Sequence, residues 1–278
     1  MDTDEYVELR VLPWARPVDV IRSRYTTFEF PTHAHAEFTI GEVLQGSELF
    51  THLGKQVEAP TGWLIHLNPS EAHNGRAGQD SWTYVSIYPD IEFLRLALPE
   101  LFACGEPYFA APVSHRPALQ GRIASFIGRV FGGADDLALQ SDLFEVLRDL
   151  IQPLSSHEAS SARGQSERSA AIASVRDQLW DEYDRSLSLT ELAESASMTP
   201  MTLLRSFREQ VGCTPQIYRT ARRLEVARAL MRDGGELAAV AIECGFTDQS
   251  HFTNTFRRWS GMTPGQYRAI ARSSRGSA

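Results

Sequence analysis

The spacing of apolar residues divides the chain into a strand-rich N-terminal part and a helical remainder. Between residues 25 and 90, short β-favouring runs alternate with Gly, Pro and Asn, which is typical of a sandwich or a barrel. The runs cover residues 28–30, 37–44, 49–52, 62–67 and 82–88. Farther along, apolar residues at helical spacing predict two helices, over 117–131 and 136–151. We therefore expect an all-β barrel with flanking helices, followed by an all-α domain.

A polar, aperiodic stretch follows the second of these helices. Residues 155–169 read Ser-Ser-His-Glu-Ala-Ser-Ser-Ala-Arg-Gly-Gln-Ser-Glu-Arg-Ser. Such a composition favours a flexible chain over regular structure. We predict a linker over residues 153–171, which separates the two domains.

One pattern occurs twice in the C-terminal hundred residues. Residues 211–219 read Val-Gly-Cys-Thr-Pro-Gln-Ile-Tyr-Arg, and residues 260–268 read Ser-Gly-Met-Thr-Pro-Gly-Gln-Tyr-Arg. The offset of 49 residues extends upstream, where Phe207 matches Phe256. An internal repeat indicates one supersecondary unit used twice. Each unit is predicted to form helix, turn and helix, the motif that places a helix in the DNA major groove.

Local signals define the helices of these units. Ser188 and Glu191 predict a capping box. Thr199 and Pro200 are expected to begin the second helix as N-cap and first helical residue. At about 100° per residue, the apolar residues of each second helix face inward and the others face outward. The outward set is Met201, Thr202, Arg205 and Arg208 in the first unit, and Gln249, Ser250, His251, Asn254 and Arg257 in the second.

These outward side chains suit the direct reading of bases. Arg can pair with guanine, Asn or Gln can pair with adenine, and Met or Leu can touch a thymine methyl group. The alternative is that both faces are ordinary solvated helix surfaces. Two tandem units with matched caps and matched core positions favour DNA reading over that alternative.

A longer motif surrounds the turn of the second unit. Residues 241–252 read Ala-Ile-Glu-Cys-Gly-Phe-Thr-Asp-Gln-Ser-His-Phe, with Phe256 and the Gly-Met-Thr-Pro-Gly-Gln-Tyr-Arg segment after them. With this motif, residues 172–272 resemble the DNA-binding domain of the AraC/XylS family of bacterial transcription regulators. The resemblance implies seven helices, one of which would run over 215–232, join the two units and stop at Gly234.

The resemblance also implies which residues touch bases. They are Met201, Leu204 and Arg205 in the first unit, and Gln249, Ser250, His251 and Asn254 in the second. Leu204 departs from the family pattern, in which polar residues are common at that position, so its contact would be apolar.

Domain roles follow from the same resemblance. Residues 1–115 resemble the cupin-like barrel that serves as the effector sensor in this family, and 172–278 would be the double helix-turn-helix domain. The helices of 116–152 are interpreted as a dimerisation pair, although an apolar stripe equally suits packing within their own domain. The implied partners are double-stranded promoter DNA, a small-molecule effector, RNA polymerase and a second copy of the chain.

We thus predict a ligand-responsive transcription regulator and not an enzyme. A metal-binding cupin, either a metal sensor or a metal-dependent enzyme, fused to a DNA-binding domain is the alternative.

The net charge of −8 at first argues against a nucleic-acid partner. The charge is unevenly placed, because residues 174–278 carry +2 and residues 1–173 carry −10. A charge of +2 is weak for a DNA-binding domain, and dimerisation would strengthen binding by linking two binding events.

The cysteines and the hydropathy pattern favour a cytoplasmic protein. Cys104, Cys213 and Cys244 show no metal-ligand spacing and are interpreted as buried thiols in a reducing compartment. The N-terminus has no apolar segment of the signal-peptide type, and no run approaches the length of a membrane span. We expect a cytoplasmic location and no membrane partner.

Histidines and carboxylates gather in the strand-rich part. Strand alternation would place His33, His35 and Glu37 on one face. Together with a second group around His73, they predict an effector pocket with hydrogen-bonding side chains. The candidate effector-binding residues are His33, His35, Glu37, His66, Glu71, His73, Trp82 and Tyr84.

A divalent metal is the second interpretation of this cluster. His33, His35 and His73 are plausible ligands. Cupin metal sites usually add a Glu a few residues after the histidine pair, but Thr39 and Ile40 occupy those positions here. The usual Gly before the last histidine is also absent. A third interpretation makes the histidine pair a structural cap at the barrel rim.

Overall fold

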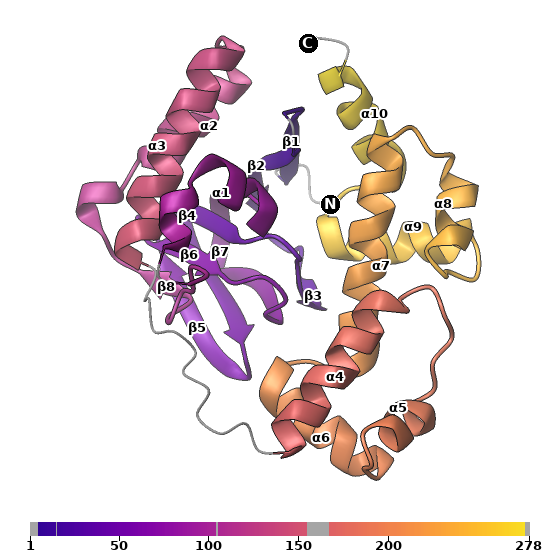
Figure 1. The fold of residues 1–278 in the computed structure, drawn as a ribbon. Coiled ribbons are helices and arrows are strands. Elements are labelled where there is room, and N and C mark those ends of the chain that lie inside the picture. Colours follow the sequence, from indigo (N-terminus) through magenta and orange to yellow (C-terminus); the bar gives the residue numbers. More distant parts are fainter. Residues whose placement is uncertain (1–4, 15, 104, 155–166, 276–278) are drawn as a thin grey trace.

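The computed structural model describes residues 5–14, 16–103, 105–154 and 167–275. Its N-terminal part is one antiparallel sheet (Figure 1). The described strands are β1 (Tyr6–Leu12), β2 (Val18–Tyr25), β3 (Phe30–His33), β4 (Thr39–His52), β5 (Lys55–Pro60), β6 (Leu64–Leu67), β7 (His73–Tyr88) and β8 (Val113–Ser114). They pair in the order β1-β2-β7-β4-β6-β8, with β3 on β7 and β5 on β4. Since β1 and β8 do not pair, the described strands form an open sheet, so the predicted β-rich domain is present but its barrel is not closed.

The strands follow the apolar pattern only in part. β4 joins two runs that were predicted as separate strands, whereas β1, β2 and β5 lie outside the predicted runs. The register of β4 against β7 shifts between Val43 and Gln45 and again between Gly46 and Glu48. An irregularity of this kind changes the face on which the following side chains lie. The alternation seen at one end of β4 therefore does not continue to its other end.

One face of the sheet is covered by helices of the same domain. These are α1 (Ile91–Ala97), α2 (Arg122–Phe131) and α3 (Asp136–Leu154). Val20 and Ile87 of the sheet pack with Ile127 of α2 and Leu147 of α3 in one buried cluster. Both predicted helices exist, but α2 begins later than expected, after a short 3-10 helix and Gly121, which has a φ of +77°.

This packing buries most of the apolar side chains of α2 and α3. All the buried side chains of α2 belong to the cluster beneath it. On α3, Leu137 is the large apolar side chain that stays exposed, at 73%. The apolar stripes therefore pack within their own domain, as the alternative interpretation had it, and dimerisation through α2 and α3 stays a prediction.

The C-terminal part contains seven described helices. They are α4 (Glu167–Asp181), α5 (Leu189–Ser195), α6 (Pro200–Val211), α7 (Pro215–Arg232), α8 (Leu237–Glu243), α9 (Gln249–Ser260) and α10 (Pro264–Arg275). The two helix-turn-helix units, α5–α6 and α8–α9, lie at opposite ends of α7 (Figure 1). The bounds of α7 are those predicted from the sequence. The helix ends at Arg232, two residues before Gly234, which has a φ of +93°.

The predicted helix caps are also present. Ser188 and Glu191 exchange hydrogen bonds with each other's backbone N–H groups, which confirms the capping box. The Thr199 hydroxyl accepts a hydrogen bond from the N–H of Thr202 at the start of α6. The linker prediction falls mainly on residues 155–166, which lie outside the described residues. Among the described helices, none combines the length and the apolar character that a membrane span requires.

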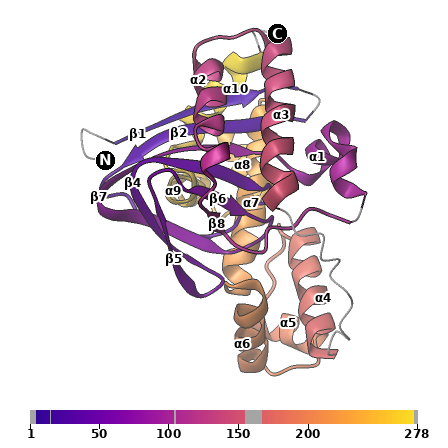
Figure 2. The same ribbon diagram turned by 90° about the vertical axis from the view of Figure 1, so that its left-hand side faces the viewer.

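The C-terminal domain closes the second face of the sheet. Leu9 and Val11 of β1 share a buried cluster with Met231 of α7, Trp259 of α9 and Tyr267 of α10. Figure 1 shows the sheet between α2 and α3 on one side and α7 and α9 on the other, and Figure 2, seen from the side of α2 and α3, shows α9 behind the strands. The sheet is thus a layer between the helices of its own domain and those of the helix-turn-helix domain.

The N-terminal sheet also contacts the same point on each helix-turn-helix unit. Gly212 and Gly261 are equivalent in the repeat, and they end α6 and α9 with φ values of +86° and +76°. A Cβ at Gly212 would lie 2.9 Å from Cδ2 of Leu53, in the turn between β4 and β5. A Cβ at Gly261 would lie 3.2 Å from the hydroxyl of Tyr25 and 3.4 Å from Cγ2 of Val7. Both helix ends need glycine, for the positive φ and for the close approach.

Candidate functional site

A pocket lies between the sheet and the C-terminal helices. Its empty space is about 870 Å³, the open mouth included. The sheet supplies one wall, and Arg228 of α7, Phe256 and Trp259 of α9 and Tyr267 of α10 close it. A concave space with mostly apolar walls and a few polar groups is typical of small-molecule sites.

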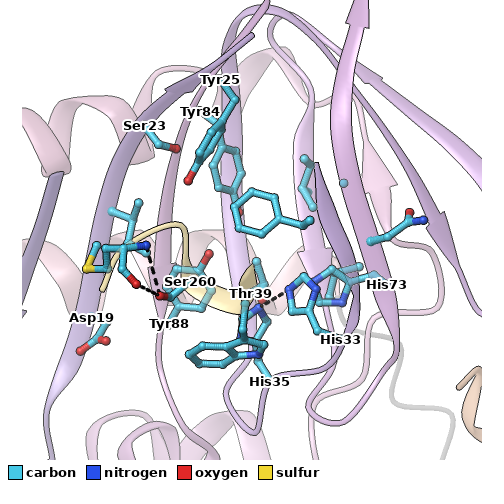
Figure 3. Close-up of a pocket in the computed structure, with 18 of the residues that line it drawn as sticks. Asp19, Ser23, Tyr25, His33, His35, Thr39, His73, Tyr84, Tyr88 and Ser260 are labelled. Carbon is cyan, nitrogen blue, oxygen red and sulfur yellow. Dashed lines mark hydrogen bonds between the residues drawn. The ribbon is translucent and has the colours of Figure 1, made fainter. Parts of the chain in front are cut away.

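Strand register determines which side chains of the sheet face the pocket. Asp19 pairs with Tyr88, Ser23 with Tyr84, and Tyr25 with Trp82 across β2 and β7. Paired residues point to the same face of a sheet, and alternate residues along a strand do so too. Figure 3 shows Asp19, Ser23 and Tyr25 on the β2 side of the pocket and the histidines across from Asp19.

One end of the pocket is aromatic. The ring centroid of Tyr25 lies 5.1 Å from that of Phe30 and 4.8 Å from that of Trp82, and Tyr84 lies next to Trp82. Glu48 of β4 also lines this end. Burial alone raises the pKa of Glu48 to about 8.

Three histidines form a second group in the pocket. The ligating nitrogens of His33, His35 and His73 all lie within 4.8 Å of one another. Nδ1 of His33 is 2.7 Å from the carbonyl of Pro31, and Nδ1 of His73 is 3.0 Å from the carbonyl of Glu71. A nitrogen that faces a carbonyl must be the donor, so Nε2 of both rings carries the lone pair.

The third ring then has a defined tautomer. Nε2 of His35 is 3.2 Å from Nε2 of His33, so His35 donates there. Nδ1 of His35 is buried without a hydrogen-bond partner. Burial lowers the pKa of His33 to about 4 and holds the pKa values of His35 and His73 well below the usual range. All three imidazoles are therefore neutral at pH 7.

A buried charge network joins the two domains beside these histidines. The Arg228 guanidinium forms ion pairs with Asp19 and, at 3.0 Å, with Glu37. Burial opposes the charge, but the two carboxylates raise the pKa of Arg228 well above its ordinary value. The Tyr267 hydroxyl donates to Asp19 at 3.3 Å. The indole of Trp259 donates to the carbonyl of Ala34 at 3.4 Å.

The structure brings together most, but not all, of the predicted pocket residues. His33, His35, His73, Trp82 and Tyr84 line the pocket. His35 does so from the loop after β3, because that strand ends at His33 and does not continue as predicted. Binding of a small-molecule effector by these residues stays a prediction.

Three predicted residues lie elsewhere. Glu37 faces Arg228 and is not part of the lining. His66 lies 3.0 Å from the hydroxyl of Ser114 and packs on Phe109, because alternation along β6 turns it to the opposite face of the sheet. Glu71 pairs with His52 at 2.8 Å instead of joining the histidine cluster.

The sequence reasoning missed Asp19, Glu48 and Tyr25. The strand that carries Asp19 and Tyr25 precedes the runs that were recognised, and the register shifts of β4 conceal the orientation of Glu48. The β-branched residues Val18, Val20 and Ile21 were a signal for β2 that was available in the sequence.

The predicted base-reading faces are free of the sensor sheet. In α6, Met201 and Arg205 are exposed, while Leu203 and Phe207 are buried as the helix register required. In the second unit, all the predicted residues are exposed: Gln249, Ser250, His251, Asn254 and Arg257. Thr202 and Leu204 are half-buried, and Arg208 is exposed. Base contacts by these residues stay predictions.

A β-sheet that forms a pocket with a double helix-turn-helix domain is the architecture of a DNA-binding regulator. The family model "AraC-like ligand binding domain" matches residues 17–147, and the model "Helix-turn-helix domain" matches residues 192–270. The chain belongs to the AraC family of transcriptional regulators, with a ligand-binding domain and a DNA-binding domain.

Similar proteins are known at the level of sequence and of fold. The HTH-type transcriptional regulator YbfI of Bacillus subtilis (strain 168) is 27% identical over 240 residues, which are 84% of this chain and 85% of that protein. The HTH-type transcriptional activator RhaS of Escherichia fergusonii is 34% identical over 91 residues, about a third of each chain. The crystal structure of ToxT from Vibrio cholerae O395 has the same fold, with a TM-score of 0.54 at 13% identity over 91% of this chain and 98% of that one.

Proposed function

We propose that the pocket between the domains is the effector site, and that its occupant controls how the second helix-turn-helix unit meets promoter DNA. One observation carries this proposal. Phe256 and Trp259, which line the pocket, belong to α9, the helix that carries the predicted base-reading residues of that unit. An occupant would therefore touch the back of the helix whose front reads DNA.

Control would act through helix position and not through occlusion. The outward residues of α9 are exposed while its inner face is docked on the sheet. A ligand changes such an equilibrium only if it binds the docked and undocked states with different affinity. The lining meets that requirement, because it is assembled from both domains and separates when they part.

Promoter DNA, RNA polymerase and a second copy of the chain are the proposed partners. The relative RhaS is named an activator, which supports activation as the outcome here. A dimer would use surfaces other than the buried stripes of α2 and α3. One solved structure of ToxT is described as bound to an unsaturated fatty acid. That ligand belongs to ToxT, and the ligand class for this chain has to come from its own pocket.

Metal binding is a second candidate function, which the histidine cluster favours. Nε2 of His33 and of His73 already carry lone pairs, and backbone carbonyls orient both rings as outer-shell partners do in metal sites. A Zn²⁺-like ion would tie β3 to β7 and neutralise no carboxylate, since none of the described carboxylates joins the cluster. Elemental analysis should find a metal in the native protein and none in His73→Gln. A metal-free native protein would exclude this candidate.

The pocket is proposed as a sensor without catalysis. Glu37, the carboxylate near the histidines, is already engaged by Arg228. It is therefore not free to act as a general base or as the fourth ligand of a catalytic metal.

A disulfide lock tests the proposed control of α9. In the double variant Val7→Cys with Gly261→Cys, the new side chains would start close together, since a Cβ at 261 lies 3.4 Å from Cγ2 of Val7. The positive φ at position 261 strains this cysteine in both redox states, so the comparison is between the oxidised and the reduced form of the same double variant. We expect oxidation to change the affinity for a selected operator by about tenfold, within the usual range of allosteric coupling. The two single-cysteine variants, oxidised and reduced, are the controls. Equal affinities of the locked and reduced double variant would exclude control through this docking.

A further inference from the structure

Glu48 is a carboxyl group without a protein partner in the aromatic end of the pocket. No hydrogen bond or ion pair reaches it from the described residues, and burial is the one cause of its raised pKa. A Cβ added at Gly75 of β7 would lie only 2.5 Å from Oε1 of Glu48. The carboxyl group therefore occupies space that is open because residue 75 is glycine. Glu48 is half-buried in the wall of the pocket, and a carboxylate that is partly removed from water normally has a charged or hydrogen-bonded partner. An unpartnered one in a pocket indicates that the partner arrives from outside.

The other charges of the pocket leave no place for an anion. Among the described residues, the charged groups that line it are Asp19, Glu48 and Arg228. Arg228 is already neutralised by Asp19 and Glu37. The ring N–H groups of the three histidines are already used, since His33 and His73 donate to the carbonyls of Pro31 and Glu71 and His35 donates to His33. A carboxylate or phosphate in this space would face the Glu48 carboxyl with no free positive charge to receive it.

The walls around Glu48 suit a positive charge. Tyr25, Phe30, Trp82 and Tyr84 line the same end, with ring centroids of neighbours 4.8 to 6.3 Å apart. The faces of aromatic rings attract cations within about 6 Å, and quaternary ammonium groups are recognised in this way. The ring edge of Trp82 also lies near the carboxyl, since Cη2 of Trp82 would be 3.7 Å from the same Cβ at Gly75.

We propose that the effector is a small organic ammonium ion, whose charged head lies between the Glu48 carboxylate and the rings of Tyr25, Trp82 and Tyr84. The inference rests on the proposed function in one respect, namely that the molecule in this pocket is the effector. The rest of the ligand would extend toward Trp259 and so reach the back of α9.

Three probes of one shape and different charge test this proposal. Phenyltrimethylammonium, its neutral carbon isostere tert-butylbenzene, and benzenesulfonate share a phenyl ring and a tetrahedral head group. Their dissociation constants are measured at pH 8 on the full chain by calorimetry and by quenching of tryptophan fluorescence. We expect the cation to bind at least about tenfold more tightly than the neutral isostere, a difference of about 1.4 kcal/mol. Benzenesulfonate should bind most weakly.

Substitution of the carboxyl separates charge from shape. Glu48→Gln keeps the size of the side chain, and it should weaken the cation about tenfold while leaving tert-butylbenzene within about twofold. Glu58→Gln is the matched control, because it removes one negative charge from the neighbouring strand β5 at an exposed position outside this pocket. That variant should bind all three probes as the native chain does.

The outcomes distinguish the two proposals. Equal affinity for the cation and its neutral isostere, or unchanged cation binding in Glu48→Gln, would overturn the ammonium ligand and leave the pocket as the effector site. Failure of all three probes to bind up to their solubility limits would also overturn the ammonium ligand, whereas the proposed control of α9 is tested separately by the disulfide lock. If Glu48→Gln does not fold, Glu48→Asp, which withdraws the charge by one methylene, should weaken only the cation.

Discussion

Arg228 of α7 and Asp19 of β2 form a buried ion pair between residues 209 positions apart in the chain. Arg228 is 5% exposed and Asp19 is 3% exposed. The pair attaches the helix between the two DNA-reading units directly to the sensor sheet. Removing one member of such a pair leaves the other charge buried without its partner, which is strongly destabilising.

Asp19→Asn should therefore lower the free energy of unfolding by roughly 2–4 kcal/mol, somewhat below the cost of breaking a buried pair because Glu37 still faces the arginine. Glu8→Gln removes a carboxylate from an exposed pair with Arg22 on the neighbouring strands and should cost about 0.5 kcal/mol or less. Urea unfolding of both variants gives the comparison. Similar losses in the two would mean that the interdomain pair contributes no more than a surface pair.

The two recognition helices should read separate base positions. Arg205→Ala in α6 and Asn254→Ala in α9 should each cost about 1–3 kcal/mol on the selected operator and relax the preference at one position. The two positions should lie about one helical turn of DNA apart. Binding to a library of operators with single substitutions measures both effects. A variant that keeps full affinity and specificity would show that its helix face does not read bases.

The stability of the empty protein should carry a contribution from Glu48 that decreases as pH rises. The pKa of this carboxyl is about 8 in the folded chain and 4.5 as its ordinary value. Between these values the folded chain holds a proton that the unfolded chain releases, so raising the pH favours unfolding. Tyr25, Tyr84 and Tyr88 face the same space with raised pKa values and stay protonated throughout.

Melting temperatures from pH 5 to pH 9 check this prediction. Glu48→Gln should gain on the native chain from pH 5 to about pH 8, and the gain should level off above that pH. A difference that does not vary with pH would mean that Glu48 ionises normally in the pocket.

Acid should destabilise the protein through the histidine cluster. The pKa of His33 falls from 6.5 to about 4 on folding. Between these two pH values His33 is protonated in the unfolded chain and neutral in the folded chain. Stability is then lost as the pH drops from about 6.5 toward 4. His33→Gln should reduce this loss and leave the slope above pH 7 unchanged. An identical acid limb in the variant and the native chain would contradict the neutral state of the buried ring.

Local signals explain why the helical domain could be predicted from the sequence. The repeat, the capping box at Ser188 and the N-cap at Thr199 all act within a few residues. The pocket was only partly predictable, since Trp82 and Tyr84 follow simple alternation, whereas Glu48 lies beyond two register shifts. Nothing local could indicate that α7 and α9 complete the pocket, because those contacts join residues about two hundred positions apart.

The paired contacts at Gly212 and Gly261 have a consequence for operator geometry. Because the N-terminal sheet contacts both helix-turn-helix units at equivalent points, it fixes the distance and the relative rotation of α6 and α9. Each added base pair turns one half-site by about 35° relative to the other, given about 10.5 base pairs per turn. The docked protein should thus bind operators with a single number of base pairs between the two half-sites. A protein in which the sheet has separated from the helix-turn-helix units should also bind operators whose spacer is one base pair longer or shorter.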